Sequence, residues 1–279
     1  TDRKVRAVLD PRGFVLAQRT IRHDADTFPG MPRSWSSCAF SLFVLVGLVH
    51  AQADAAVRVY ILAGQSNMEG KAQNKLWEHQ AQSPATAKVF AHLRNGEQWA
   101  IRDDVFIRYG SRSGKLTLGY GSRDRTGVEL EFGTRLGENY DEPVLLIKTC
   151  WGGHSLVRNF RSPSAGLPSD EVLKKELKAA RERVTKQNEK RKQKNPEAKG
   201  APLPSMTDIH GVYGASYRKL LTEVREVLSG GYRTMFPELK ARELKLAGFV
   251  WSQGWNDQYG GAEQEYAANM EHFIRDVRK

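Results

Sequence analysis

The stretch that decides the fold class is residues 57–63, which read VRVYILA and are followed by Gly64. β-Branched and aliphatic residues dominate this run, a pattern typical of a buried strand in a parallel sheet. Two further runs have the same character, residues 143–149 (PVLLIKT) and residues 246–252 (LAGFVWS), and residues 105–109 form a shorter candidate. The sequence therefore predicts three buried strands and one short strand.

Helical patterns lie between and after these strands. Apolar residues recur every four positions over residues 128–140 and 213–228, as on one face of an amphipathic helix. Residues 84–93 begin with Pro84 in their first turn, and residues 262–277 form the last helical segment. Strands that alternate with helices predict an α/β fold with a parallel sheet.

The first 53 residues have the features of a leader. A short basic region precedes 12 apolar residues (residues 38–49, CAFSLFVLVGLV), and Ala51-Gln52-Ala53 forms an A-x-A cleavage site. This order predicts a secretory signal peptide over residues 31–53, export to the periplasm or the extracellular space, and a domain over residues 54–279. The polar residues 1–30 are expected to be a spurious upstream extension. The alternative is an uncleaved signal anchor.

Composition and charge exclude several classes of protein. Hydrophobic residues make up 40% and charged residues 27%, which allows a core of ordinary size and excludes a largely disordered chain. No apolar run reaches the ~18–20 residues of a membrane-spanning helix, so no stable membrane insertion is expected. Of the net charge of +11, the leader contributes +3 and residues 171–199 contribute +6. Because the rest of the chain is nearly neutral, we expect no nucleic-acid partner.

The charged stretch lies within residues 164–206, whose composition differs from the rest. A thin apolar stripe runs along its first half, and residues 185–199 are almost wholly polar. This pattern predicts an inserted, solvent-exposed helix that fades into a mobile linker. The stripe consists of Leu173, Leu177, Ala180 and Val184.

Only two cysteines are present, Cys38 in the leader and Cys150. Removal of the leader would leave Cys150 alone, so no disulfide is expected within the mature chain.

Polar, glycine-containing turns follow each of the three buried strands. In a parallel sheet, ligands bind at the carboxyl ends of the strands, so these turns form a candidate site. The turns are Gly64-Gln65-Ser66-Asn67-Met68, Trp151-Gly152-Gly153-His154-Ser155 and Gln253-Gly254-Trp255-Asn256-Asp257.

The residue types in these turns suit acyl transfer. Ser66 follows a tight strand-to-helix turn that can present its hydroxyl and its free backbone N–H at the sheet edge. Gly152 and Gly153 have no side chain, so their N–H groups can approach an oxyanion, and Gln253 offers a side-chain amide. A nucleophile with converging donors stabilises a tetrahedral intermediate. Taken singly, Ser66 could equally cap a helix, the glycines could form a plain turn, and Gln253 could bind a loop.

Three blocks of this sequence resemble one family of enzymes. AGQSNM (residues 63–68), IKTCWGGHSL (residues 147–156) and FVWSQGWND (residues 249–257) are similar to successive blocks of the sialate O-acetylesterase-like domain, or carbohydrate esterase family six, of the SGNH hydrolases. The resemblance covers about residues 57–279, with the charged insertion as a departure. It implies a flavodoxin-like three-layer α/β/α sandwich that removes O-acetyl groups from carbohydrates without a metal or other cofactor.

The resemblance also assigns roles to individual residues. Ser66 would be the nucleophile, and the backbone of Ser66, Gly152 or Gly153 and the amide of Gln253 would form the oxyanion hole. The remaining polar residues of the three turns are candidates to line the pocket, namely Gln65, Asn67, His154, Trp255 and Asp257.

One element of the family pattern is absent from the sequence. The family completes its site with Asp-x-x-His after a further strand, and these 279 residues contain no Asp-x-x-His. A serine hydroxyl without a general base is a weak nucleophile at neutral pH. We therefore expect a chain that is truncated and lacks the last strand of its sheet. Of the seven histidines, only His154 lies in one of the three blocks, and a base role for it is a minor alternative.

Two other functions remain open. The domain could bind acetylated carbohydrates without hydrolysing them, or the chain could bind an anionic polymer through the basic residues between Lys174 and Lys199.

Overall fold

The computed structural model describes residues 7–9, 15–17 and 55–279. The chain divides into two units, Thr1–Ala55 and Ala56–Lys279. In the first unit, β1 (Ala7–Leu9) and β2 (Val15–Ala17) pair antiparallel. The signal peptide predicted over residues 31–53 lies outside the described residues, so it stays a prediction.

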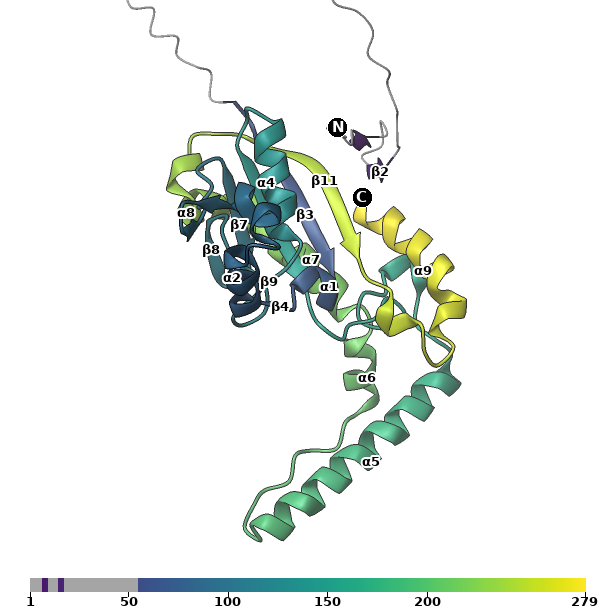
Figure 1. Cartoon of the computed structure of the whole chain (residues 1–279). Coiled ribbons are helices and arrows are strands. Elements are labelled where there is room, and N and C mark those ends of the chain that lie inside the picture. The colour runs from purple at the N-terminus through teal and green to yellow at the C-terminus, as the bar shows by residue number, and fades with distance from the viewer. Residues whose placement is uncertain (1–6, 10–14, 18–54) are drawn as a thin grey trace, which may run out of the picture. The chain divides into compact units, whose positions relative to one another are not determined.

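The second unit is built on a five-stranded, mostly parallel sheet with the order β11-β3-β10-β7-β8 (Figure 1). The first four strands of this order run parallel, and β8 pairs antiparallel with β7 at one edge. At the other edge β11 is partly exposed, whereas β10 is buried along its whole length. The strands are β3 (Val57–Gly64), β7 (Val105–Tyr109), β8 (Arg112–Lys115), β10 (Val144–Cys150) and β11 (Leu244–Ser252).

Alternate residues of the central strands face opposite sides of the sheet, as the period of a strand requires. On one face, Val59 and Ile61 of β3 join a core with residues of α7 (Ala215–Glu226) and α9 (Ala262–Val277). On the other face, Tyr60 and Leu62 join a core with Met68 of α1 (Ser66–Glu69) and with α4 (Glu129–Asn139). Helices therefore flank the sheet on both faces, and the α/β class is confirmed.

The remaining elements are short, apart from one helix. The two small antiparallel ladders are β4 (Ala72–Gln73) with β9 (Arg125–Thr126) and β5 (Arg94–Asn95) with β6 (Gln98–Trp99). The other helices are α2 (Asn74–Gln82), α3 (Ala87–Phe90), η1 (Ala91–Leu93), η2 (Pro163–Ala165), α5 (Asp170–Lys194), α6 (Met206–Val212), η3 (Val227–Gly231), α8 (Tyr232–Met235), η4 (Pro237–Leu239) and η5 (Trp255–Asp257).

The long strands and helices match the sequence predictions closely, and the short elements do not. The helix predicted over residues 84–93 is only the two short turns α3 and η1, while α2 was not predicted. Gly- and Ser-rich residues 110–122 suggest a loop, but part of this stretch forms β8. Edge strands of four residues depend on pairing with a neighbour, which local composition does not encode.

The insertion at residues 164–206 contains the long helix α5, which leads away from the sheet (Figure 1). Its apolar stripe packs against α6 in a small core formed by Leu173, Ile209 and Tyr213. The helix continues through Lys194, so the prediction of a linker from residue 185 was wrong for residues 185–194. A run of Lys, Arg, Gln and Glu has strong intrinsic helix propensity, and this propensity extends α5 beyond its packed turns.

Candidate active site

The three polar turns begin side by side. In the parallel register, Cys150 at the end of β10 and Ser252 at the end of β11 both pair with Gly64 at the end of β3. The segments that follow these three residues therefore leave the sheet at one level. The predicted convergence of the three turns is confirmed.

The turn that holds Ser66 is fixed closely against β11. Gly64 has φ of +149°, and a Cβ at this position would collide with the carbonyl of Ser252, so only glycine fits. The next amide, that of Gln65, donates to the Ser252 carbonyl at 3.1 Å. Ser66 is half-buried at the start of α1, and within residues 55–279 its hydroxyl makes no hydrogen bond.

Gly152 and Gly153 lie exposed at the end of β10. Their N–H groups make no hydrogen bond within residues 55–279, so both remain free to donate. A Cβ at Gly152 would lie 2.6 Å from Oε2 of Glu69, so a larger residue there would displace that carboxylate. Glu69 also forms an ion pair with Lys71 at 2.8 Å. This carboxylate faces the glycine pair, so an oxyanion bound there would feel a negative charge nearby.

Gln253 connects all three turns. Its Nε2 donates to Oε1 of Gln65 at 3.0 Å, to the carbonyl of His154 at 3.2 Å and to a carboxylate oxygen of Asp257. Gln65 in turn donates to Oδ1 of Asn256 at 3.3 Å. In this arrangement the amide protons of Gln253 are already used within the protein.

The predicted pocket residues fall into two groups. Asp257 and Gln65 are each only 1% exposed, so they lie beneath the site surface. The carboxylate of Asp257 accepts hydrogen bonds from the amides of Leu156 and Val157, both at 2.8 Å, and so shapes the second turn. Asn67 and Trp255 are exposed and remain available to a ligand.

The ring of His154 is bound by a second serine, Ser216. Its Nδ1 lies 2.6 Å from Oγ of Ser216 in α7, and its ring stacks on Trp151 with a centroid separation of 6.0 Å. Ser216 is 3% exposed, and among the described residues its hydroxyl has no other acceptor. The Ser216 hydroxyl group therefore donates its hydrogen bond to Nδ1 of His154. The ring proton of His154 then lies on Nε2. In this tautomer neither ring nitrogen is free to accept a proton from Ser66.

Burial and the nearby ammonium group of Lys219 lower the pKa of His154, and the carboxylate of Glu69 opposes them. Lys219 follows Ser216 by one turn of α7, and its Nζ lies 4.9 Å from the centre of the Trp151 ring. The imidazole is therefore neutral at neutral pH and takes up a proton only below its usual range. Since the unfolded chain takes up this proton first, His154 favours the folded state less as pH falls below about 6.5.

We expect the His154 ring to titrate below pH ~6.5 in an NMR titration. The substitution Lys219→Met should move the midpoint upward because it removes the repelling charge. Lys240→Met, which removes an exposed charge outside this cluster, serves as the control and should leave the midpoint unchanged. An unshifted midpoint in Lys219→Met would show that Lys219 does not act on His154.

Two other histidines have partners elsewhere. His92 lies 2.6 Å from Glu131, and Nδ1 of His272 lies 2.9 Å from Oγ of Ser164. Among the described residues, no histidine contacts the Ser66 hydroxyl.

A buried ion pair behind the site was missed by sequence reasoning. Lys148 and Glu129 are both fully buried, and their side chains meet at 2.6 Å. Nζ of Lys148 also donates to the carbonyls of Glu69 and Tyr120, both at 2.9 Å, so all three of its protons are used. Glu69 ends α1, so Lys148 anchors the helical turn that begins at Ser66. A lysine inside the apolar run 143–149 was the signal available in the sequence.

The other potential nucleophile near the site is inert. Cys150 is buried, and burial raises the pKa of its thiol to about 12.

Within the described part of the chain, no cluster of three or more His, Cys, Asp or Glu side chains is arranged to hold a metal ion. No helix in residues 55–279 combines the length and the apolar character needed to cross a membrane.

Comparison with known families shows which family this α/β domain is similar to. Residues 56–191 match the family described as carbohydrate esterase, sialic acid-specific acetylesterase. This match confirms the resemblance seen in the first two sequence blocks. The third block, residues 249–257, lies beyond the matched range. No curated protein matches the chain.

Three solved structures are similar to this chain at low sequence identity. A protein from Arabidopsis thaliana is 12% identical with a TM-score of 0.42, and the match covers 80% of this chain and 68% of that one. A novel carbohydrate acetylesterase from Xanthomonas citri is 16% identical with a TM-score of 0.36, covering 79% and 38%. NanS is 15% identical with a TM-score of 0.39, covering 81% and 63%.

Proposed function

We propose that this protein is a serine hydrolase that removes O-acetyl groups from carbohydrates, with Ser66 as its nucleophile. The observation that supports this most strongly is the strand register, in which Cys150 and Ser252 both pair with Gly64. This register brings the Ser66 turn beside the free amides of the glycine pair. We also propose that the sheet is that of a flavodoxin-like three-layer sandwich, which the helices on both faces support.

In the proposed reaction, Oγ of Ser66 bonds to the acetyl carbonyl carbon as its proton passes to a base. The N–H groups of Ser66, Gly152 and Gly153 stabilise the oxyanion that forms. The bond to the sugar oxygen then breaks, this oxygen takes up a proton, and acetyl-Ser66 remains. Water attacks the acetyl group, and acetate leaves with Ser66 restored. Acetate release by the wild type and by Ser66→Ala tests this proposal.

The proton acceptor is the open part of this mechanism. Within residues 55–279, no imidazole or carboxylate forms a hydrogen bond with the Ser66 hydroxyl. The tautomer assigned to His154 does not suit a base, and its Nε2–H suits a donor to the acetylated sugar. In the family pattern, an Asp-x-x-His segment would supply the base.

This observation favours one second candidate function. A site with free amide donors and no base hydrogen-bonded to its serine can bind an acetylated sugar without cleaving it. Binding without acetate release by wild-type protein would support this candidate over hydrolysis.

Gln253→Ala distinguishes two roles for this side chain. If Gln253 turns toward the oxyanion during the reaction, its loss should slow acetate release about 10²–10³-fold. If it only ties the three turns together, the main effect should be a lower thermal midpoint, because Gln65 and Asp257 lose a buried donor. Acetate release and thermal unfolding of the same variant check this. A large rate loss at an unchanged midpoint supports the proposed role, and wild-type kinetics contradict it.

We propose that the protein is exported through the signal peptide at residues 31–53. The A-x-A site predicts that the exported chain begins near Asp54, which N-terminal sequencing would show. Replacing Ala51 by Arg should block cleavage, because small residues are required there. An exported wild-type chain that begins at Thr1 or Met31 would contradict the proposal.

A further inference from the structure

The long helix α5 and the segment that returns from it form a defined arm, residues 170–205. Beyond Leu173 at its base, no residue of α5 is buried. The return segment is nevertheless fixed to the helix. Asn188 donates to the carbonyl of Ala201 at 2.8 Å and accepts from its amide at 2.7 Å, and Nε of Arg181 donates to the carbonyl of Pro204 at 2.9 Å. The arm is therefore an ordered projection and not a loose linker.

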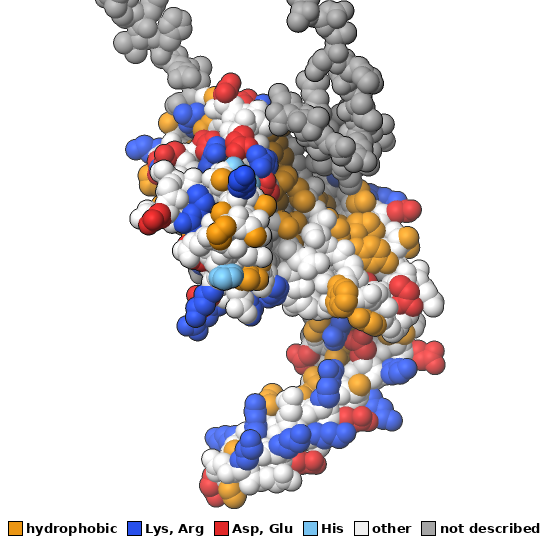
Figure 2. All heavy atoms as spheres, in the orientation of Figure 1, with side chains coloured by type: hydrophobic (Ala, Val, Ile, Leu, Met, Phe, Trp, Pro, Cys, Tyr) orange, Lys and Arg blue, Asp and Glu red, His pale blue; other side chains and the backbone are white. Residues whose placement is uncertain are grey.

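The charge of α5 is strongly positive and has no partner in the fold. The helix contains ten Lys and Arg residues and five Asp and Glu residues. All ten basic side chains are exposed, and among the described residues none forms an ion pair. Basic side chains gather along the arm in Figure 2. Such a concentration of like charge repels itself, so it does not stabilise the arm.

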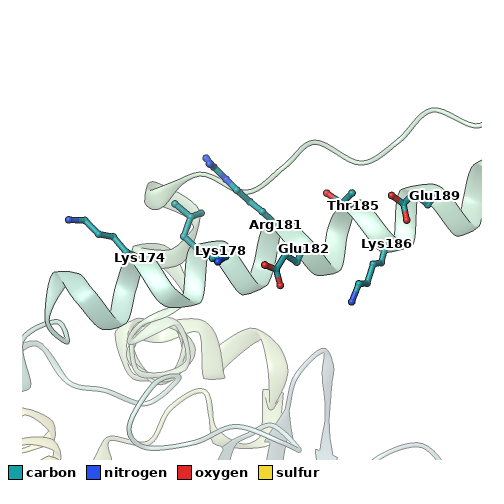
Figure 3. Close-up of a pocket in the computed structure, with 8 residues that line it drawn as sticks. Lys174, Lys178, Arg181, Glu182, Thr185, Lys186 and Glu189 are labelled. Atoms are coloured by element: carbon teal, nitrogen blue, oxygen red, sulfur yellow. The ribbon is translucent and has the colours of Figure 1, made fainter.

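The basic side chains form rows that a long anion can follow. Lys186, Lys190 and Lys194 are spaced by four residues, so they lie along one side of the helix. An open groove of about 530 Å³ runs along α5 itself, and its charged lining residues are Lys174, Lys178, Arg181 and Lys186 together with Glu182 and Glu189 (Figure 3). A surface that lies along one helix suits an extended polymer better than a compact ligand.

The base of the arm adjoins the candidate active site. Glu176 near the start of α5 forms an ion pair with Arg158 at 3.2 Å, in the segment that follows the glycine pair. The carbonyl of Arg158 accepts from the amide of Gly214, two residues before Ser216. The ion pair of Glu176 therefore ties the base of the arm to the segment that follows the glycine pair.

We propose that the arm binds an anionic polysaccharide through the exposed Lys and Arg side chains of α5. Charge complementarity supports a polyanion, and residues 170–199 contain no aromatic residue on which nucleic-acid bases could stack. The choice of a polysaccharide over other polyanions rests on the proposed function, because the matched family consists of carbohydrate esterases. A polymer held along the arm would stay attached to the protein that carries Ser66.

Binding of polygalacturonate to the full chain tests this proposal without any hydrolysis step, because this polymer has no acetyl ester. We expect binding at low salt that weakens as NaCl approaches about 0.3 M, where screening is strong. The triple variant Lys186→Gln, Lys190→Gln and Lys194→Gln should bind about 10-fold more weakly, while glutamine preserves the helix. The matched control, Lys75→Gln, Lys88→Gln and Arg123→Gln, removes three exposed charges outside the arm and should bind within about twofold of wild type.

Several outcomes would overturn the proposal. They are no binding of polygalacturonate at low salt, equal losses in the two triple variants, or tighter arm-dependent binding of single-stranded DNA than of polygalacturonate. Neutral xylan should not bind through the arm. Ser66→Ala should bind polygalacturonate like wild type, so a failure of the esterase proposal and a failure of the arm proposal give different results.

Discussion

Replacing Lys148 by methionine is expected to lower the free energy of unfolding by about 3–5 kcal/mol, because it leaves the buried carboxylate of Glu129 without its partner. Methionine has a similar length and leaves little cavity, so the loss should come from the unpaired charge and not from packing. The carbonyls of Glu69 and Tyr120 also lose a donor. Urea denaturation of the two proteins measures the difference.

Two further variants separate the charge effect from a packing effect. In the double variant Lys148→Met, Glu129→Leu, no unpaired charge remains, so part of the lost stability should return. Arg135→Met removes an exposed partner of Glu131 and Glu138 and should cost about 1 kcal/mol or less. A Lys148→Met protein as stable as Arg135→Met would show that the buried pair does not anchor the turn.

Replacing Ser66 by alanine is expected to reduce acetate release from an acetylated carbohydrate to a small residual rate. Removal of the nucleophile abolishes the acyl-enzyme route, and the free amides of the glycine pair alone support only weak residual catalysis. The substitution should leave stability nearly unchanged, since the Ser66 hydroxyl makes no hydrogen bond within residues 55–279. Parallel assays of acetate release and thermal unfolding check both expectations.

Ser229→Ala provides the matched control for this experiment. Ser229 is exposed in η3, and its hydroxyl makes only a long hydrogen bond of 3.4 Å to the carbonyl of Glu226. The Ser229→Ala variant should release acetate at the wild-type rate. Equal acetate release by Ser66→Ala and wild type would remove Ser66 from the mechanism.

The long elements could be predicted because their sequence patterns act locally. The apolar run at residues 57–63 became β3, and residues 262–277 became α9 with the same limits. Strand β8 and helix α2 were missed because pairing and packing decide them, and their composition does not. The helical end of α5 was missed because high polarity suggested a linker, while intrinsic helix propensity acts without any packing.

The location of the candidate site could be predicted from the sequence, but the contacts within the site could not. Strand order brings the three turns together, and the rule for parallel sheets anticipates this. The sequence could not show that Ser216, 62 residues after His154, takes its Nδ1. It also could not show that Asp257 is buried beneath the second turn, because side-chain direction in a short helix such as η5 depends on tertiary packing.

The most direct test of Ser66 as the nucleophile is capture of the acetyl-enzyme. Wild-type protein is mixed with p-nitrophenyl acetate, quenched in acid within the first turnover, digested and analysed by mass spectrometry. The proposed mechanism predicts an acetyl group on the peptide that contains Ser66, and no such group in Ser66→Ala treated in the same way. Acetate release by the wild type without acetylation of that peptide, or with acetylation only at other residues, would contradict it.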